Sequence, residues 1–192
     1  MIVRVGCAPR EASLSFEAFQ EHWASEHGAL AGTIPGLRSY VQNHAVLADG
    51  SPLLPYVGFD ACSELSFDSL EAMDAGFGSE HYRTNVTADE KVLVDKARFG
   101  MLLTERRVLS DGEPGEGAVK LLTFLTDGRE TDAAGAIRHE QLVVIPGAHD
   151  GRIAPFADLV DIIWFPTVDD ALEFAETDGE ARRLLARELR IV

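Results

Sequence analysis

Apolar residues near the start of the chain recur with the period of an α-helix. Trp23 and His27 both lie within roughly 60° of Phe16 when successive residues are placed about 100° apart. His22 precedes His27 by five residues, about 140° around such a helix, so we expect it to point elsewhere. The pattern therefore predicts an amphipathic helix over residues 16–27 whose buried face carries a tryptophan and a histidine.

The rest of the first half alternates between strand and helix patterns. Strands are predicted at residues 2–7, 37–47, 56–61 and 101–109, and helices at residues 16–27, 67–76 and 88–97. Ser15 and Ser66 are placed to cap the first two helices, because a serine oxygen accepts hydrogen bonds from the free amides of a helix N-terminus. The order β-α-β-β-α-β is the ferredoxin-like plan.

A polar, glycine-rich segment at residues 110–117 ends this unit. The pattern then restarts, with strands predicted at residues 119–126, 142–145 and 158–165 and helices at residues 130–140 and from Asp169. The segment DALEFA from Asp170 also echoes DSLEAM from Asp68. We therefore predict a duplication, with a first unit at residues 1–109, a linker at residues 110–117 and a diverged second unit at residues 118–192.

One face of a ferredoxin-like sheet is apolar and needs another layer to cover it. Two fused units can cover each other within one chain. The predicted fold class is therefore α+β, with two ferredoxin-like β-α-β-β-α-β repeats forming an α/β barrel whose antiparallel sheets pack face to face. Ala136 and Ile137 stand where the first unit has Trp23, so we expect the first unit to carry the site.

Charge and composition narrow the classes of partner. The formal net charge of -15 argues against nucleic acid and anionic membrane surfaces, which bind clustered Lys and Arg. The sequence has no long apolar run for a membrane span and no apolar signal region at its start, so we expect a cytoplasmic protein. Cys7 and Cys62 lack CxxC spacing, and we expect both to be small buried strand residues.

Motifs for the common cofactors and for covalent catalysis are missing from the sequence. It contains no GxGxxG after a strand, no phosphate-binding GxxxxGK[ST] loop and no GxSxG nucleophile turn. The six histidines show no tight ligand spacing. We therefore expect neither a metal nor another cofactor.

Two segments carry a resemblance to a known family. They are HWASEHGALAGTIPGLRSYVQNH at residues 22–44 and EHYRTNVTADEKVLVDKARFGMLLTERRVL at residues 80–109. The His-Trp pair, the second histidine, the Pro-Gly turn and the later acidic helix together resemble the EthD family of the dimeric α/β-barrel superfamily. The likeness covers about the first 108 residues. It implies the barrel fold, here in a tandem two-repeat form, and relatives that include lactone isomerases, polyketide cyclases and cofactor-independent monooxygenases.

Without cofactor motifs or a nucleophile motif, acid–base catalysis is the chemistry that remains. His27 is the first candidate for the catalytic residue. An imidazole with a pKa near 6.5 both accepts and donates protons at neutral pH. His44 and His81 are further catalytic candidates. The alternative for His27 is a core histidine satisfied by a backbone carbonyl. The candidate carboxylates that could orient an imidazole are Glu26, Asp89, Glu90 and Asp95.

Aromatic residues are candidates for the wall of a substrate pocket, although each could equally be a core residue. They are Trp23, Tyr40, Phe59, Phe77 and Tyr82. Alternation along the strand that follows the first helix leaves open which of two sets faces that helix. One set is Leu37, Ser39, Val41 and Asn43, and the other is Arg38, Tyr40, Gln42 and His44.

Three classes of function stay open. The first is a cofactor-independent enzyme that isomerises, dehydrates, cyclises or cleaves a hydrophobic oxygenated molecule, such as an aromatic catabolite or polyketide-like intermediate. The second is a non-catalytic ligand-binding accessory protein of a degradation pathway. The third is a haem-binding barrel, which requires an axial histidine over a deep pocket. All three have a small hydrophobic ligand as partner, and a homodimer is compatible with each.

Overall fold

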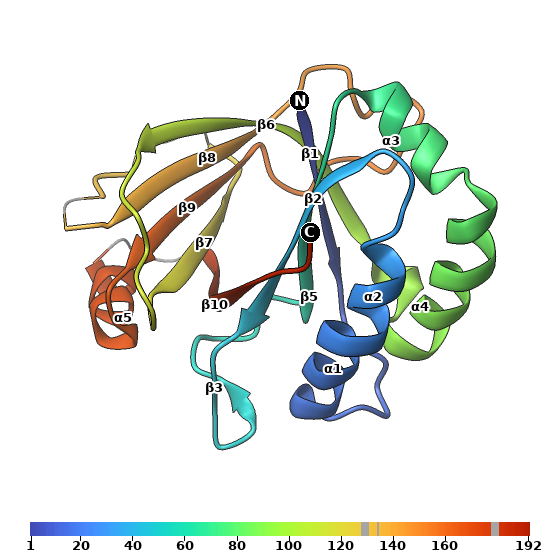
Figure 1. Cartoon of the computed structure of the whole chain (residues 1–192). Coiled ribbons are helices and arrows are strands. Elements are labelled where there is room, and N and C mark those ends of the chain that lie inside the picture. Colours follow the sequence, from blue (N-terminus) through green and yellow to red (C-terminus); the bar gives the residue numbers. More distant parts are fainter. Residues whose placement is uncertain (128–130, 134, 178–180) are drawn as a thin grey trace.

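Eight antiparallel strands close into a barrel in the computed structural model, which describes residues 1–127, 131–133, 135–177 and 181–192 (Figure 1). The first half supplies β1 (Ile2–Ala8), β2 (Leu37–Ala45), β5 (Ala61–Phe67) and β6 (Gly100–Ser110). The second half supplies β7 (Val119–Leu125), β8 (Arg138–Val144), β9 (Leu159–Phe165) and β10 (Arg182–Arg190). A short hairpin of β3 (Leu47–Ala48) and β4 (Ser51–Pro52) lies outside the barrel.

The two halves share one strand order. Neighbouring strands run β6-β1-β5-β2 in the first half and β10-β7-β9-β8 in the second. In each half this places the fourth strand beside the first and the third beside the second, as in a ferredoxin-like sheet. The halves join where β2 pairs with β10 and where β6 pairs with β8. The predicted barrel of two ferredoxin-like halves is therefore confirmed.

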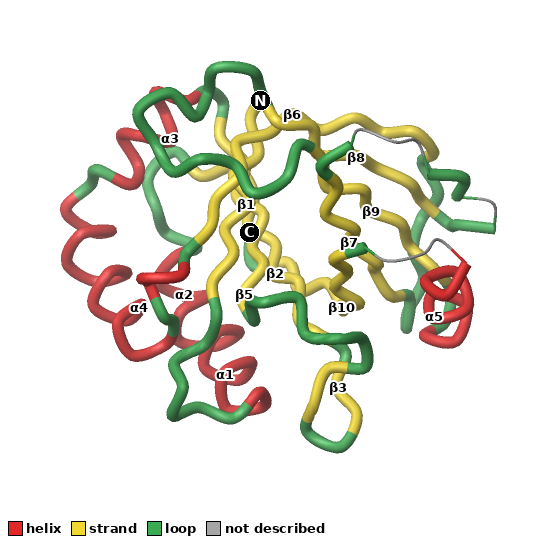
Figure 2. Tube along the Cα trace, turned by 180° about the vertical axis from the view of Figure 1, so that it is seen from behind, coloured by secondary structure: helices red, strands yellow, loops and turns green. Residues whose placement is uncertain are grey.

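Most helices cover the outer face of the first half, and α5 (Val168–Thr177) lies against the second (Figure 2). The first-half helices are α1 (Phe16–His22), α2 (Gly28–Ala31), α3 (Leu70–Phe77) and α4 (Thr87–Leu93). A π-helical segment, Trp23–His27, joins α1 to α2, another, Tyr82–Val86, precedes α4, and a short 3-10 turn, Lys96–Arg98, follows it. In the described part of the chain, no helix has the length and apolar character needed to cross a membrane.

The first helix begins where the sequence predicts. The Oγ of Ser15 accepts a hydrogen bond from the backbone amide of Ala18 at 3.1 Å, which confirms the predicted N-cap. Leu14 and Phe19 pack in one cluster, as expected for residues that flank such a cap.

Two element predictions in the middle of the first half are wrong. Residues 56–60 form an irregular loop, and the strand is β5, at Ala61–Phe67. Ser66 belongs to β5, and Ser69 is the residue that caps α3, accepting a hydrogen bond from the amide of Ala72. The inward-facing positions of β5 include Glu64 and Ser66, both buried, so the strand does not show the usual hydrophobic alternation.

The second half departs from its predicted pattern at its first helix. The prediction of a helix at residues 130–140 is wrong where the structure describes that segment, because residues 135–137 form a turn and Arg138–Val144 forms β8. Glu130 lies outside the described residues. Strand β8 pairs with both β6 and β9, and this pairing overrides the local helical signal.

The barrel interior is apolar over part of its length. Val3, Val5 and Cys7 of β1 point into it and pack with Leu122 of β7 and Ile162 of β9. Inward side chains fill the interior of an eight-stranded barrel. The even-numbered residues of β1 therefore face outward, toward the helices. Cys62 pairs with Cys7 across β1 and β5, and both cysteines are buried and free, as predicted.

Charged residues from both halves fill the other part of the interior. The Nζ of Lys120 is buried, donates to Glu64 at 2.7 Å and to Asn43 at 2.8 Å, and pairs with Glu188 at 2.9 Å. Arg106 bridges Glu64 at 2.7 Å and Glu140 of the second half. Burial alone would raise the pKa of Glu64, but Lys120 and Arg106 outweigh burial and lower this pKa to about 2.

The last residues of the second half lie on the first. The amide of Ile191 donates to the carbonyl of Tyr40 at 2.8 Å, and the amide of Tyr40 donates to the carbonyl of Val192 at 3.1 Å. A Cβ at Gly28 would lie 3.1 Å from Ile191, and a Cβ at Gly32 would lie as close to the same side chain, at 3.1 Å. Gly28 of α2 and Gly32, which follows this helix, therefore let the end of the chain pack tightly beside β2.

We predict that Glu64→Gln destabilises the protein by about 3 kcal/mol, because it leaves Lys120 buried with one anion fewer. Chemical denaturation at pH 7 measures the change. Asp68→Asn is the control, since it removes a carboxylate that pairs with Arg38 on the exposed surface and should cost less than about 1 kcal/mol. Equal losses for the two variants would contradict a structural role for the buried network.

The same variant should change the response to acid. Because the folded-state pKa of Glu64 lies at about 2, below its ordinary value of 4.5, its contribution is fully present above pH 4.5. That contribution is lost as the pH falls from 4.5 toward 2. Denaturation midpoints of wild type and Glu64→Gln should therefore converge over this window.

Candidate functional site

A cavity of about 160 Å³ lies between the helices of the first half and the outer face of its sheet. Trp23 and His27 line it from the π-helical segment after α1, and Tyr40 lines it from β2. Phe77, at the end of α3, and Tyr82, in the second π-helical segment, complete this aromatic wall. An apolar cavity of about 150 Å³ in another protein holds benzene. The cavity is therefore large enough for one aromatic ring.

Four of the five predicted pocket aromatics meet at this cavity, and Phe59 does not. The Phe59 ring lies inside the barrel, with its centroid 5.2 Å from that of Phe124 and 6.2 Å from that of Phe156. It precedes β5 at the rim of the barrel, where its side chain turns inward. The strand alternation is also resolved, because Tyr40, Gln42 and His44 of β2 face the helices.

The π-helical segment decides where the histidines point. In a π turn the backbone bonds link residues five apart, here from the amide of Gly28 to the carbonyl of Trp23. The wider turn brings His22 and His27, also five apart, onto one side of the helix. The expectation that His22 points elsewhere is therefore wrong. Periodicity on a regular α-helix could not reveal this, although the HWxxxH spacing in the EthD-like motif is a signal that both histidines belong together.

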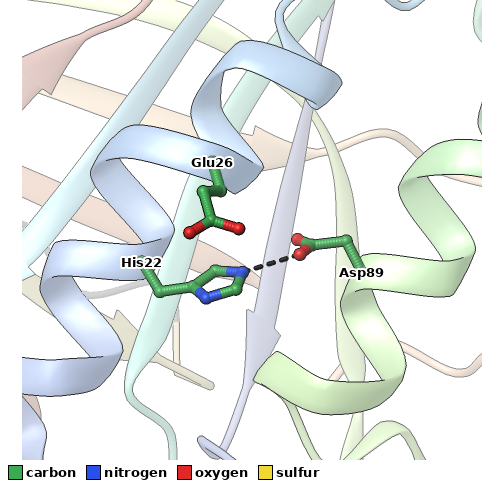
Figure 3. Close-up of side chains that lie close together, drawn as sticks. All are labelled: His22, Glu26 and Asp89. Atoms are coloured by element: carbon green, nitrogen blue, oxygen red, sulfur yellow. Dashed lines mark hydrogen bonds and ion pairs between the residues drawn. The ribbon is translucent and has the colours of Figure 1, made fainter.

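Asp89 of α4 holds both histidines (Figure 3 shows its bond to His22). Its Oδ1 lies 2.6 Å from Nε2 of His22, and its Oδ2 lies 2.8 Å from Nδ1 of His27. An ionised carboxylate only accepts hydrogen bonds, so each imidazole donates one N–H to it. His27 then carries its proton on Nδ1 and keeps a lone pair on Nε2. Because His27 lines the cavity, that nitrogen is the one left to a ligand.

The other candidate carboxylates have separate roles. Glu90 lines the cavity, accepts a hydrogen bond from the Tyr82 hydroxyl at 3.0 Å and pairs with Lys96. Burial raises the pKa of Tyr82 to about 12, so the phenol stays neutral. Asp95 pairs with Arg98 and caps the turn after α4.

His44 and His81 lie away from the cavity. The His44 ring packs on Trp23 with centroids 4.6 Å apart, and its Nε2 bonds to Gln42 at 2.8 Å. Burial lowers the pKa of His44 to about 4. The Nε2 of His81 lies 2.9 Å from the carbonyl oxygen of Leu30. This contact links the start of the second π-helical segment to α2. Of the three candidate histidines, the structure brings only His27 to the cavity wall.

Within the described part of the chain, no residue accepts a hydrogen bond from the Tyr40 hydroxyl. The Nε2 of Gln42 donates to this hydroxyl at 2.8 Å and to the carbonyl of Trp23 at 2.7 Å. Burial raises the pKa of Tyr40, so the hydroxyl stays protonated. With its oxygen accepting, the Tyr40 O–H can donate to an oxygen of a bound molecule.

His22, Glu26 and Asp89 are also the residues that could hold a metal ion, since one ligand atom of each lies within 4.8 Å of the others (Figure 3). Imidazole and carboxylate ligands suit zinc and related divalent metals. However, the 2.6 Å between His22 and Asp89 is a hydrogen-bond distance. Two ligands of one zinc ion lie roughly 3.3 Å apart, so these side chains would have to move to bind it.

We predict that His22 carries its proton on Nε2 and His27 on Nδ1, because each donates to Asp89. Nitrogen chemical shifts of ¹⁵N-histidine-labelled protein distinguish the two tautomers. His44 is the internal control, since its low pKa should keep it neutral down to about pH 5, with a midpoint at about pH 4. A proton on Nε2 of neutral His27 would contradict the arrangement.

Comparisons with known proteins place this site within a known domain. Residues 11–97 match the EthD domain. They include the π-helical segment, the strand that carries Tyr40 and helix α4. No curated protein matches the chain significantly.

Solved structures share the fold of the whole chain. An anthrone oxidase-like protein matches with a TM-score of 0.60 and 9% identity, over 99% of this chain and 93% of that one. A mutant chlorite dismutase from Candidatus Nitrospira defluvii matches with a TM-score of 0.50 and 10% identity, over 99% and 92%. A provisionally named monooxygenase from Lactobacillus acidophilus matches at 0.50 and 14%, over 100% and 94%. Residues 11–97 are therefore similar to the EthD domain, and they form part of a barrel of two ferredoxin-like halves.

Proposed function

We propose that the protein is a cofactor-independent acid–base enzyme acting on a hydrophobic, oxygenated small molecule with about one ring. An isomerisation, a dehydration or cyclisation, or a lyase reaction would fit, on an aromatic catabolite or polyketide-like intermediate. The observation that carries this proposal is the hydrogen bond of 2.8 Å from Nδ1 of His27 to Asp89, with His27 in the cavity wall.

The residues divide the work of a proton transfer. Nε2 of His27 removes a proton from carbon or oxygen of the bound molecule, and the imidazolium that forms lies against the Asp89 carboxylate. His22, bonded to the other Asp89 oxygen, keeps that carboxylate in place. The Tyr40 hydroxyl donates to the substrate oxygen where negative charge develops. His27 then returns the proton to a different atom.

The size of the cavity argues against the haem-binding alternative. A porphyrin macrocycle is far larger than a space of about 160 Å³. The walls on either side, Trp23 and Tyr40, are buried in packed clusters that would have to open. We therefore derive no step through haem.

Hydrogen–deuterium exchange tests the proposal without knowledge of the natural substrate. A general base in the cavity should speed loss of the α-hydrogens of one-ring ketones in D2O, followed by proton NMR on cyclohexanone, cyclohex-2-enone and acetophenone. His27→Ala should lower the enzyme-dependent rate by about 10²- to 10⁴-fold. His44→Ala is the matched control, because that histidine lies off the cavity, and it should stay within a few-fold of wild type.

The other outcomes of the exchange experiment distinguish the alternatives. Equal rates for His27→Ala and wild type would remove His27 from the mechanism. Exchange by wild type no faster than by free imidazole at the same concentration would favour the non-catalytic ligand-binding role. Treatment with EDTA should leave the rate unchanged, because the Asp89 oxygens are occupied by the two histidines. Loss of activity on chelation would instead indicate a metal at His22, Glu26 and Asp89.

A further inference from the structure

Arg4 places an unpaired cation in the wall of the cavity. It is an outward-facing residue of β1, and its guanidinium carbon lies 4.3 Å from the centroid of Phe77 and 5.1 Å from that of Phe99. Among the described residues, its guanidinium has no hydrogen bond and no carboxylate within 4.0 Å. The guanidinium lies over both rings, and no described residue accepts a hydrogen bond from its N–H groups.

The other charges of the cavity wall neutralise each other. Glu90 and Lys96 form an ion pair there, and Glu90 also accepts the hydrogen bond from Tyr82. Leaving His27 aside, the wall therefore has an excess of one positive charge, carried by Arg4. Glu90 acts on Arg4 electrostatically from the same wall, but among the described residues no carboxylate forms a direct ion pair with the guanidinium.

The sequence makes room for this guanidinium at the cost of local stability. A Cβ at Gly6 would lie 3.0 Å from Nη1 of Arg4 and 3.0 Å from the hydroxyl oxygen of Ser63, so glycine leaves the space that the side chain occupies. Burial lowers the pKa of Arg4, which shows that the surroundings disfavour its charge. Arg4 is half-buried, and a partly desolvated charge whose N–H groups lack an acceptor is costly. Such a cost is commonly retained where a ligand supplies the partner.

We propose that Arg4 is the anion-binding group of this cavity and that the ligand is a one-ring molecule with a carboxylate. A guanidinium presents two parallel N–H groups that match the two oxygens of a carboxylate. The rings of Phe77 and Tyr82, whose centroids lie 4.8 Å apart, supply the apolar wall for the rest of the molecule. The inference rests on the proposed function for the identity of the cavity, and it deepens that function by naming the substrate class.

The arrangement also gives Arg4 a positioning role. Arg4 and His27 come from different elements, β1 and the π-helical segment, and both line the same cavity. A carboxylate fixed at Arg4 would restrict the ring to few orientations. The atom presented to Nε2 of His27 would then depend on where the ring carries its carboxylate.

Benzoate and benzamide form a matched pair of probes, since they have nearly the same shape and differ in charge at pH 7. Calorimetric titration of the wild-type protein should show benzoate binding about 10- to 100-fold more tightly, the range expected for hydrogen bonds to a charged group. Arg4→Met should abolish this preference. Arg98→Met is the control, because Arg98 is an exposed arginine that pairs with Asp95, and it should keep the preference.

A measurement on wild type alone guards against misfolding of the Arg4 variant. The Nε–H resonance of Arg4 should shift on addition of benzoate and not on addition of benzamide. Equal affinity of wild type for the two probes, or a preference that survives in folded Arg4→Met, would overturn the proposal.

The two proposals can fail separately. Benzoate preference without ketone exchange would leave Arg4 as the anion-binding group of a non-catalytic protein. Ketone exchange without benzoate preference would retain the acid–base function and remove the carboxylate from its substrate.

Discussion

The buried charges inside the barrel are the constraint on which the rest of the structure depends. Lys120 of the second half reaches Glu64 of the first, and Arg106 of the first reaches Glu140 of the second. Ions out of water must be paired, so the two sheets can meet in only the register that satisfies these groups. The space that remains beside these groups, about 730 Å³, is lined mainly by charged and polar side chains and does not suit an apolar ligand. The ligand cavity lies instead on the outer face, beneath the helices of the first half.

On that outer face, three elements each supply one part of the proposed site. The π-helical segment turns His27 toward α4, where Asp89 fixes its tautomer. Strand β2 supplies the Tyr40 hydroxyl, and β1 supplies the Arg4 guanidinium. Among its described residues, the second half lacks a helix that would correspond to α1, and its outer face carries a different buried pair, His139 with Asp161 at 2.7 Å. The duplication therefore preserved the barrel while the two outer faces diverged.

The features of the fold that depend on apolar periodicity and on helix capping can be predicted from the sequence. The barrel, the first helix and its Ser15 cap follow from apolar spacing and side-chain chemistry. The strand β5 was misplaced because its inward side chains are charged and polar. The meeting of His22 with His27 depends on a π turn, which hydrophobic spacing does not signal. Arg4 was overlooked because a single arginine in an apolar strand is typical of a surface position, and only the folded cavity shows that it is enclosed.

The contact between the chain's last residues and α2 makes the first repeat dependent on the second. Ile191 fits against Gly28 and Gly32, and the backbone of residues 191–192 completes the hydrogen bonding of Tyr40. The matched EthD region ends at residue 97, so part of the support for its cavity wall comes from the far end of the sequence. A fragment cut at the boundary between the repeats would expose the edge of β2 and loosen Tyr40. The support for the cavity wall thus comes from both repeats, even though the family match occupies only one of them.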